Sequence, residues 1–216
     1  AYCEQIDEQI GRILDALEAS GQAGQTIVAF CTDHGDMLGA HHMWIKSWMP
    51  YEDVYHMPLV VRVPGTAPGV CERLVQTHDV PHTILDLLGV PALPHADGHS
   101  LRPLLSDPAC DDWPDARLCV GYGCEFFVTQ RMVVTADHKY VFNGFDVDEL
   151  YDLRNDPHEM HNRIDDPSFA EIRGRLRGKL YELMNRYEDP YGDVGPGGCN
   201  HQRPNRYGAP RYLPRE

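Results

Sequence analysis

The chain has 216 residues, 42% of them hydrophobic and 24% charged, which is the balance of an ordinary globular protein. That length fits one domain, or one domain with a small second lobe. The formal net charge of −14 argues against a nucleic-acid-binding protein, because a phosphate backbone needs a concentrated positive surface. No apolar run approaches the roughly 20 residues that span a bilayer, and no C-x-x-C pair indicates a zinc knuckle or a redox motif.

The chain starts in a helical pattern at Ala1, without a methionine or a signal sequence. This start suggests a fragment or a processed chain, and it leaves the compartment open. Five apolar residues recur at helical spacing on one face, and Gly21 follows them as a stop signal. They are Ile6, Ile10, Ile13, Leu14 and Leu17. The pattern predicts an amphipathic helix that ends shortly before Gly21.

Two short runs of apolar and β-branched residues, at 26–31 and 58–63, predict buried parallel strands. A helix, a strand and a loop that begins at Asp33 follow the rhythm of an α/β sheet. A further short helical pattern ends at Gly89, and Asp79 is its predicted N-cap residue. The first part of the chain is therefore expected to be an α/β domain.

The pattern changes after a Pro-, Asp- and His-rich stretch at 91–114, which we expect to connect two lobes. Strand-like runs joined by short turns then predict an antiparallel meander, on which Cys119 and Cys124 are expected to be free thiols. These runs lie at 118–122, 126–135 and 139–142. Ser168 and Glu171 predict a capping box for a final helix that packs on this sheet.

These patterns divide the chain into three expected parts. Residues 1–110 form the α/β part, 111–188 form a small subdomain of antiparallel strands plus a helix, and 189–216 form an extended tail rich in Pro and Gly. The expected fold class is therefore α/β with a small C-terminal α+β lobe.

Asp33, His34 and Gly35 give the sharpest chemical signal, because they follow directly on a predicted strand. Functional groups of an open sheet collect in the crevice beyond the carboxyl ends of its strands. An adjacent carboxylate and imidazole there can both reach one divalent cation, while Gly35 lets the backbone turn behind them. The alternative is a simple strand-end turn in which Asp33 caps backbone amides.

Lys46 lies in a loop with an unusual composition. A lone lysine is most often a solvated surface residue, and that interpretation stays open. Two histidines and two tryptophans nevertheless accompany this ammonium, and they could build a partly dry pocket for an anion. They are His41, His42, Trp44 and Trp48.

The order of segments resembles the second half of sulfatases, from about residue 1 to residue 185. The likeness rests on six short motifs in sequence, each weak alone, beginning with the run Thr32-Asp-His-Gly-Asp-Met-Leu-Gly39. The remaining motifs are His41, Lys46 and Tyr51-Glu52; Met57 to Arg62 with Pro64-Gly65; Asp79 to Gly89; Asp97 to Leu105; and Glu149 to Pro157 with Glu159 and Asn162.

This resemblance implies a partial alkaline phosphatase-like sandwich and the cleavage of a sulfate ester to alcohol and sulfate. Asp33 and His34 match the second pair of ligands for a divalent metal, usually calcium. Many sulfatases have Asn in place of His34, and the Asp-His form also occurs with manganese in phosphonate and phosphodiester hydrolases of the superfamily. Lys46 matches the lysine that contacts the sulfate oxygens, and His41 is assigned a contact to the substrate or to a metal ligand, with loop capping as its alternative.

The family's nucleophile is a cysteine in C-x-P-x-R that is oxidised to formylglycine, and this sequence has no counterpart. We therefore expect the isolated chain to be inactive, with the formylglycine in a preceding segment. Three interpretations stay open: part of a sulfatase that acts on a small sulfate ester or a sulfated sugar, part of a phosphonate monoester or phosphodiester hydrolase, or a non-catalytic binding and assembly module. The sequence leaves the oligomeric state open.

Overall fold

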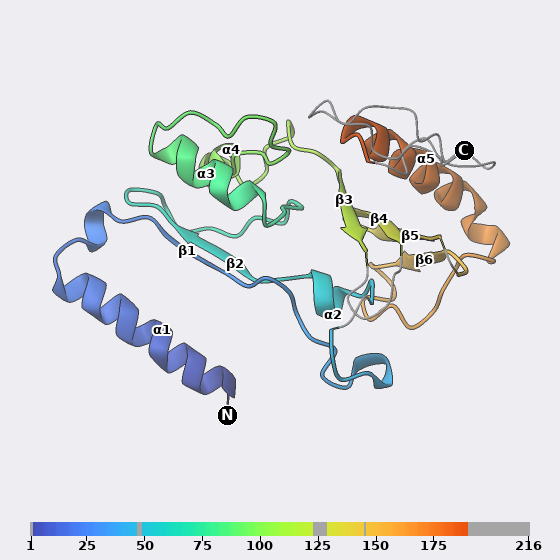
Figure 1. Cartoon of the computed structure of the whole chain (residues 1–216), viewed down its shortest axis with the longest axis horizontal. Coiled ribbons are helices and arrows are strands. Elements are labelled where there is room, and N and C mark those ends of the chain that lie inside the picture. Colours follow the sequence, from blue (N-terminus) through green and yellow to red (C-terminus); the bar gives the residue numbers. More distant parts are fainter. Residues whose placement is uncertain (1, 47–48, 123–128, 145, 190–216) are drawn as a thin grey trace, which may run out of the picture.

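The structure is a computed structural model that describes residues 2–46, 49–122, 129–144 and 146–189 (Figure 1). Helices and strands alternate in the first part of the chain, as the sequence predicts. They are α1 (Tyr2–Ala19), β1 (Val28–Cys31), α2 (Glu52–Tyr55), β2 (Leu59–Arg62), α3 (Asp79–Leu87) and α4 (Arg102–Ser106). The second part contains β3 (Ala116–Gly121), β4 (Gln130–Thr135), β5 (His138–Asn143), β6 (Glu149–Asp152) and α5 (Ala170–Arg186).

β1 and β2 pair with each other in antiparallel register, from Val28 opposite Arg62 to Cys31 opposite Leu59. The prediction of buried parallel strands was wrong in both respects, since Phe30 is 40% and Val60 63% exposed. An apolar run predicts burial but carries no information on strand direction. The segment between the two strands holds α2, a single helical turn, and the chain returns alongside β1 in the opposite direction.

The helix at the start of the chain forms as predicted and is followed by Gly21, whose φ of 71° suits a residue without a Cβ. None of the residues of α1 is buried in the described part of the chain. Its predicted apolar face is at most half-buried, and Ile13 remains 68% exposed. The periodicity therefore predicted the helix correctly, but this face of it has little cover.

The four-stranded sheet is an antiparallel meander in the order β3-β4-β5-β6, which confirms the predicted topology. The strand β6 was not predicted, and β4 starts at Gln130 within the expected run. Cys119 is a free thiol in β3, as expected, while Cys124 and most of the expected tail lie outside the described residues.

One face of this sheet packs against α5 and forms the larger apolar core (Figure 1). The core combines alternate residues of the strands with four buried residues of the helix. Its buried members are Ala116, Leu118, Val133, Tyr140, Leu150, Leu176, Leu180, Leu183 and Met184. The predicted capping box was wrong: Asp166, not Ser168, caps the turn before α5 by accepting a hydrogen bond from the Ser168 amide at 2.9 Å. An acidic side chain two residues earlier reaches that amide first.

The opposite face of the sheet is also buried, and it adds several polar side chains to apolar ones such as Met132 and Val141; we call it the polar face. Because side chains alternate along a strand, the partners of the apolar residues point to this second face. It includes Arg117, Gln130, Lys139, Asn143 and Tyr151, each at most 6% exposed. The residues around α2 cover it, since Lys139 contacts both Pro50 and Glu52. The segment that joins β1 to β2 thus packs on the polar face through the residues around α2.

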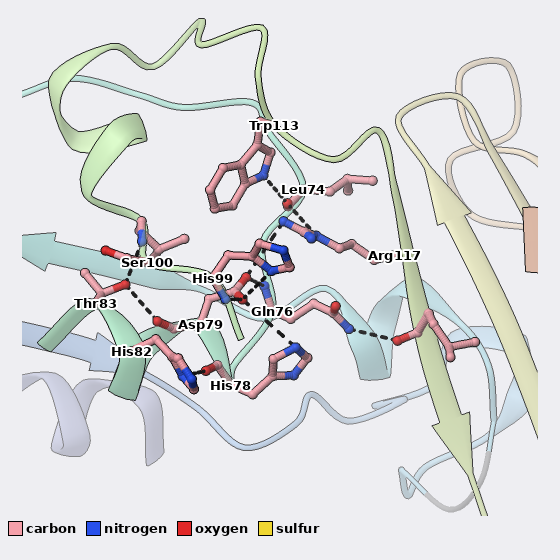
Figure 2. A network of polar contacts seen from close by, with 12 residues as sticks. Leu74, Gln76, His78, Asp79, His82, Thr83, His99, Ser100, Trp113 and Arg117 are labelled. Atoms are coloured by element: carbon pink, nitrogen blue, oxygen red, sulfur yellow. Dashed lines mark hydrogen bonds and ion pairs between the residues drawn. The ribbon is translucent and has the colours of Figure 1, made fainter. Parts of the chain in front are cut away.

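The expected connection at 91–114 is ordered and packs on α3. The prediction of Asp79 as the N-cap of α3 was wrong, because His78 takes that position. Asp79 is fully buried within the first turn of the helix. The Asp79 carboxylate instead accepts hydrogen bonds from the amides of Gln76 and His99, both at 2.8 Å (Figure 2). The side chain therefore ties the connection to the helix, a distant contact that local sequence does not reveal.

Three further hydrogen bonds join residues 74–76 to β3 and to Trp113 just before it (Figure 2). The indole of Trp113 and the guanidinium of Arg117 both donate to the carbonyl oxygen of Leu74, at 2.9 and 3.0 Å. Gln76 donates to the carbonyl oxygen of Leu118 in β3 at 2.9 Å. The boundary expected near residue 110 stays a prediction, and these contacts cross it.

Candidate functional site

The candidate site begins directly after β1, where the loop folds back against α2. The Gly35 amide donates to the carbonyl oxygen of Val54 at 2.8 Å. A Cβ at Gly35 would lie 1.9 Å from the carbonyl oxygen of Asp53, far inside van der Waals contact. Glycine is therefore required here for close approach to α2, rather than for the sharp turn that the sequence suggested.

Asp33 and His34 lie together beyond the end of the strand. The Asp33 Oδ1 atom accepts from the His34 amide at 3.0 Å, so this oxygen does cap the turn. Its other oxygen, Oδ2, lies 3.4 Å from His34 Nε2. A hydrogen bond from its own amide is the main cause that holds the pKa of Asp33 below its usual value, and the hydrogen bond from the His34 amide acts in the same direction. A role as a cap and a role as a metal ligand are thus compatible for Asp33. One oxygen accepts from the His34 amide, while the other lies near the imidazole.

Hydrogen bonding selects one tautomer for His34. Its Nδ1 lies 2.7 Å from the carbonyl oxygen of Gly35, which can only accept, so Nδ1 carries the proton. The lone pair on Nε2 is then free to bind an ammonium group or a metal. Metal-binding histidines are commonly oriented in this way, through an N–H donated to a backbone carbonyl.

Lys46 reaches the same point from the far side of the loop. Its Nζ lies 2.5 Å from His34 Nε2, although the side chain is otherwise exposed. The structure therefore brings together the three residues that sequence reasoning singled out, Asp33, His34 and Lys46. Within the described chain no group of three or more His, Cys, Asp or Glu side chains could hold a metal, so Asp33 and His34 are a partial donor set.

His41 is placed differently. Its ring stacks on Tyr51, with centroids 3.8 Å apart and planes 7° from parallel, and its backbone φ is 49°. Its Nε2 atom is buried without a hydrogen-bond partner. Trp44 is 74% exposed, so it forms no dry pocket within the described chain, and Trp48 lies outside the described residues.

Sequence reasoning missed a buried ionic cluster beneath this loop. Lys139 of β5 is fully buried, and its Nζ lies 2.6 Å from Glu52 and 2.7 Å from Glu159. Glu52 and Glu159 belong to the motifs quoted above, but Lys139 looks like any polar residue on an alternating strand. The only available signal was the pairing of its strand with the rest of the meander.

The comparisons with known proteins agree with this geometry. The sequence model of the family described as N-sulphoglucosamine sulphohydrolase, C-terminal, matches residues 39–186. The chain belongs to the sulfatase family. It corresponds to a C-terminal portion, and it spans about a third of the length of the curated relatives it matches, 37% and 34% in two cases. No helix of the described residues is long and apolar enough to cross a membrane.

One relative is the N-acetylglucosamine-6-O-sulfatase of Bacteroides thetaiotaomicron, 33% identical over 85% of this chain and 34% of its own length. A solved sulfatase-like structure, described as a complex with its substrate D-glucosamine-2-N,6-O-disulfate, is 29% identical with a TM-score of 0.74, over 85% of this chain and 39% of that one. The phosphonate monoester hydrolase of Silicibacter pomeroyi is 28% identical with a TM-score of 0.76, over 96% and 43%. These neighbours confirm the predicted fold class.

Proposed function

We propose that this chain supplies the sulfate-binding lysine and half of the metal site of a sulfuric ester hydrolase. The observation that carries the proposal is the convergence of Asp33, His34 and Lys46, in which both side-chain partners of His34 Nε2 lie within 3.4 Å. Sequence places Lys46 in a separate part of the loop, so this convergence is a property of the fold. Membership of the sulfatase family supports the same reaction.

The donor atoms present fit a divalent cation. Two donors that each lie about 2.4 Å from a cation at a right angle are about 3.4 Å apart, the separation of Asp33 Oδ2 and His34 Nε2. Such a cation would polarise the sulfuryl oxygens. Calcium is usual in sulfatases, whereas an imidazole ligand suits manganese better, and we propose a test of both.

Lys46 and a cation would compete for the same lone pair, that of His34 Nε2. A metal bound there would displace the ammonium of Lys46 from its 2.5 Å contact and leave it to bind a sulfuryl oxygen. The exposed position of Lys46 gives it the freedom to make that change. Positive charge placed where the negative charge of the reaction spreads is usually the largest single contribution to catalysis.

We further propose that the substrate is a sulfated sugar and that His41 contacts it. The relative named as an N-acetylglucosamine-6-O-sulfatase and the complex with glucosamine disulfate support the substrate class. The unpartnered Nε2 of His41 supports the second part, because a buried imidazole nitrogen without a hydrogen bond is unfavourable until it gains one.

The test is turnover of matched aryl sulfate and aryl phosphonate monoesters by an enzyme that carries this chain together with the nucleophile. Lys46→Ala should lower kcat for the sulfate ester by about 10²- to 10³-fold, the usual effect of removing one oxyanion partner. Lys179→Ala is the matched control, since this α5 lysine pairs with Glu182 at 3.3 Å and should leave turnover unchanged. Unchanged turnover in Lys46→Ala would show that Lys46 is a solvated surface residue without a role in sulfate binding.

The same assay separates the alternatives. A phosphonate ester that is turned over faster than the sulfate would favour a phosphonate monoester hydrolase, in line with the structural neighbour from Silicibacter pomeroyi. Metal binding is measured independently of turnover, by the broadening of His34 NMR signals on addition of Mn²⁺. Asp33→Ala should weaken that broadening, and the same titration with Ca²⁺ in competition gives the metal preference.

A further inference from the structure

Lys139 occupies the centre of the polar face of the sheet, beneath the loop that carries the candidate site. Its side chain is fully buried, and its Nζ donates to the carbonyl oxygen of Pro50 at 3.0 Å. The same ammonium pairs with Glu52 at 2.6 Å and with Glu159 at 2.7 Å. The ammonium thus makes one hydrogen bond and two ion pairs, and two of its partners, Pro50 and Glu52, lie at the start of α2.

These contacts fix the element on which both halves of the site depend. Glu159 also accepts a hydrogen bond from the Glu52 amide at 2.6 Å, which is a second attachment of the first turn of α2. Gly35, next to His34, bonds to Val54 in the same helix. Lys46 lies shortly before Pro50 along the chain. The metal-binding pair and the sulfate-binding lysine thus approach each other only if α2 stays in place on the sheet.

We propose that Lys139 is a positioning residue, which holds α2 through Pro50, Glu52 and Glu159 so that His34 and Lys46 meet. The significance of that meeting for sulfate rests on the proposed function above. An apolar residue in its place could fill the volume, but apolar contacts are not directional. One hydrogen bond and two short ion pairs at a single ammonium specify where α2 lies, and active sites require a precision of about 0.5 Å.

The charges of this cluster explain why loss of the lysine should be costly. Burial raises the pKa of Glu159, and the Lys139 ammonium acts against that rise. Without the ammonium, the buried Glu159 carboxylate would lie near the partly exposed Glu52 carboxylate with no cation between them. Removal of one partner of a buried ion pair is strongly unfavourable for this reason, whereas removal of both is tolerated far better.

The experiment compares hydrogen exchange in the full chain for two variants on opposite faces of the same sheet. Lys139→Met should speed exchange of the Gly35 and Val54 amides by tenfold or more. Leu180→Ala removes stability from the α5 side and should leave both amides within twofold of wild type, although amides of α5 exchange faster. Equal acceleration by both variants would show that Lys139 is merely one more stabilising residue and would overturn the proposal.

A second variant keeps the test decisive. In Lys139→Met/Glu159→Gln the repulsion between carboxylates is relieved, so the melting temperature should recover in part, while the two amides stay fast because the tether to Pro50 is still missing. Recovery of protection together with stability would overturn the proposal. If Lys139→Met alone does not fold, Glu159→Gln replaces it, because this variant keeps the shape of the side chain. It should also speed exchange of the Gly35 and Val54 amides, by a smaller factor.

A titration with inorganic sulfate separates this inference from the proposed function. We expect Lys139→Met to weaken sulfate binding by at least fivefold and Leu180→Ala by less than twofold. If wild type and Lys46→Ala bind sulfate equally, the function proposed for Lys46 fails. The exchange comparison would still decide whether Lys139 positions the loop, because it uses no ligand.

Discussion

The two faces of the four-stranded sheet are both buried, yet they differ in composition. The face toward α5 is mainly apolar, as in Leu150 and Leu180, each at most 1% exposed, and its buried exception is Arg131, which pairs with Asp189 at 2.9 Å. The face toward α2 holds charged and amide side chains, among them Lys139 and Asn143. Asn143 receives a hydrogen bond from Gln130 at 2.7 Å and donates to Glu149 at 2.8 Å.

This difference separates stability from placement. Burial of apolar area is favourable in many similar arrangements, so the α5 face can hold the lobe together without specifying an atomic position. Buried polar groups are favourable only when their partners are met, so the α2 face admits few arrangements. The loop of the candidate site lies on the side of the second face, because it folds against α2, which covers that face.

The largest expected effect lies on the apolar face. Leu180→Ala should lower the free energy of unfolding by about 2–5 kcal/mol, because it leaves a cavity between α5 and the sheet. Leu93→Ala, at a residue that is 50% exposed, should change it by less than about 0.5 kcal/mol. Denaturant titration measures both. A shift of the His34 NMR signals in Leu180→Ala would contradict the separation of the two faces, because His34 lies on the other side of the sheet from α5.

A smaller effect is expected where the polar face meets the site loop. Gly35→Ala forces a Cβ against the Asp53 carbonyl, at 1.9 Å unless the loop moves, and should lower stability by about 1–3 kcal/mol. The contact between His34 and Lys46 should be lost in the same variant. Gly24→Ala is the control, since its Cβ would meet nothing within 4 Å. A nuclear Overhauser contact between His34 and Lys46 that persists in Gly35→Ala would contradict this view of the loop.

The fold was predictable from sequence to the extent that local patterns determine it. Helical spacing before Gly21 and the alternating runs of the meander predicted α1 and the strand order correctly. Strand direction for β1 and β2 was wrong, because a run of apolar residues looks the same in either direction. The caps assigned to Asp79 and Ser168 were wrong because competing partners, His99 and Asp166, were not visible in the local pattern.

The candidate site divides in the same way. Asp33, His34 and Lys46 were singled out because their motifs are local, and the fold places them together. Their roles stay predictions until the variants are measured. Lys139 could not be found, since its importance comes from a contact with Pro50 that only the packing of two distant segments creates.

The smallest expected effect uses one tyrosine on each face. Tyr140, on the apolar face, donates to Asp148 at 2.5 Å, and Tyr151, on the polar face, donates to Glu149 at 2.6 Å. Burial, and then the hydrogen bond to a carboxylate, raises the pKa of both phenols far above the usual value. Each phenol therefore stays neutral in the folded chain at a pH where it would ionise in the unfolded chain.

The sign of the pH effect follows from this difference. Above about pH 10 the unfolded chain loses protons that the folded chain keeps, so stability falls by about 1.4 kcal/mol per pH unit for each such tyrosine. Tyr140→Phe and Tyr151→Phe should each remove one such contribution from the slope between pH 10 and 11, measured by urea titration. Tyr2→Phe, at an 83% exposed residue, should leave the slope unchanged.

The two variants should differ in what they do to the site. Tyr151 packs edge-on against Tyr51 with centroids 6.1 Å apart, and Tyr51 stacks on His41. Loss of the Tyr151 hydroxyl should therefore shift the His41 ring signals at neutral pH. Loss of the Tyr140 hydroxyl should not, because Tyr140 packs in the core on the α5 side of the sheet. Equal shifts in both variants would mean that the sheet transmits disturbance through either face, and the division between a stabilising and a positioning face would fail.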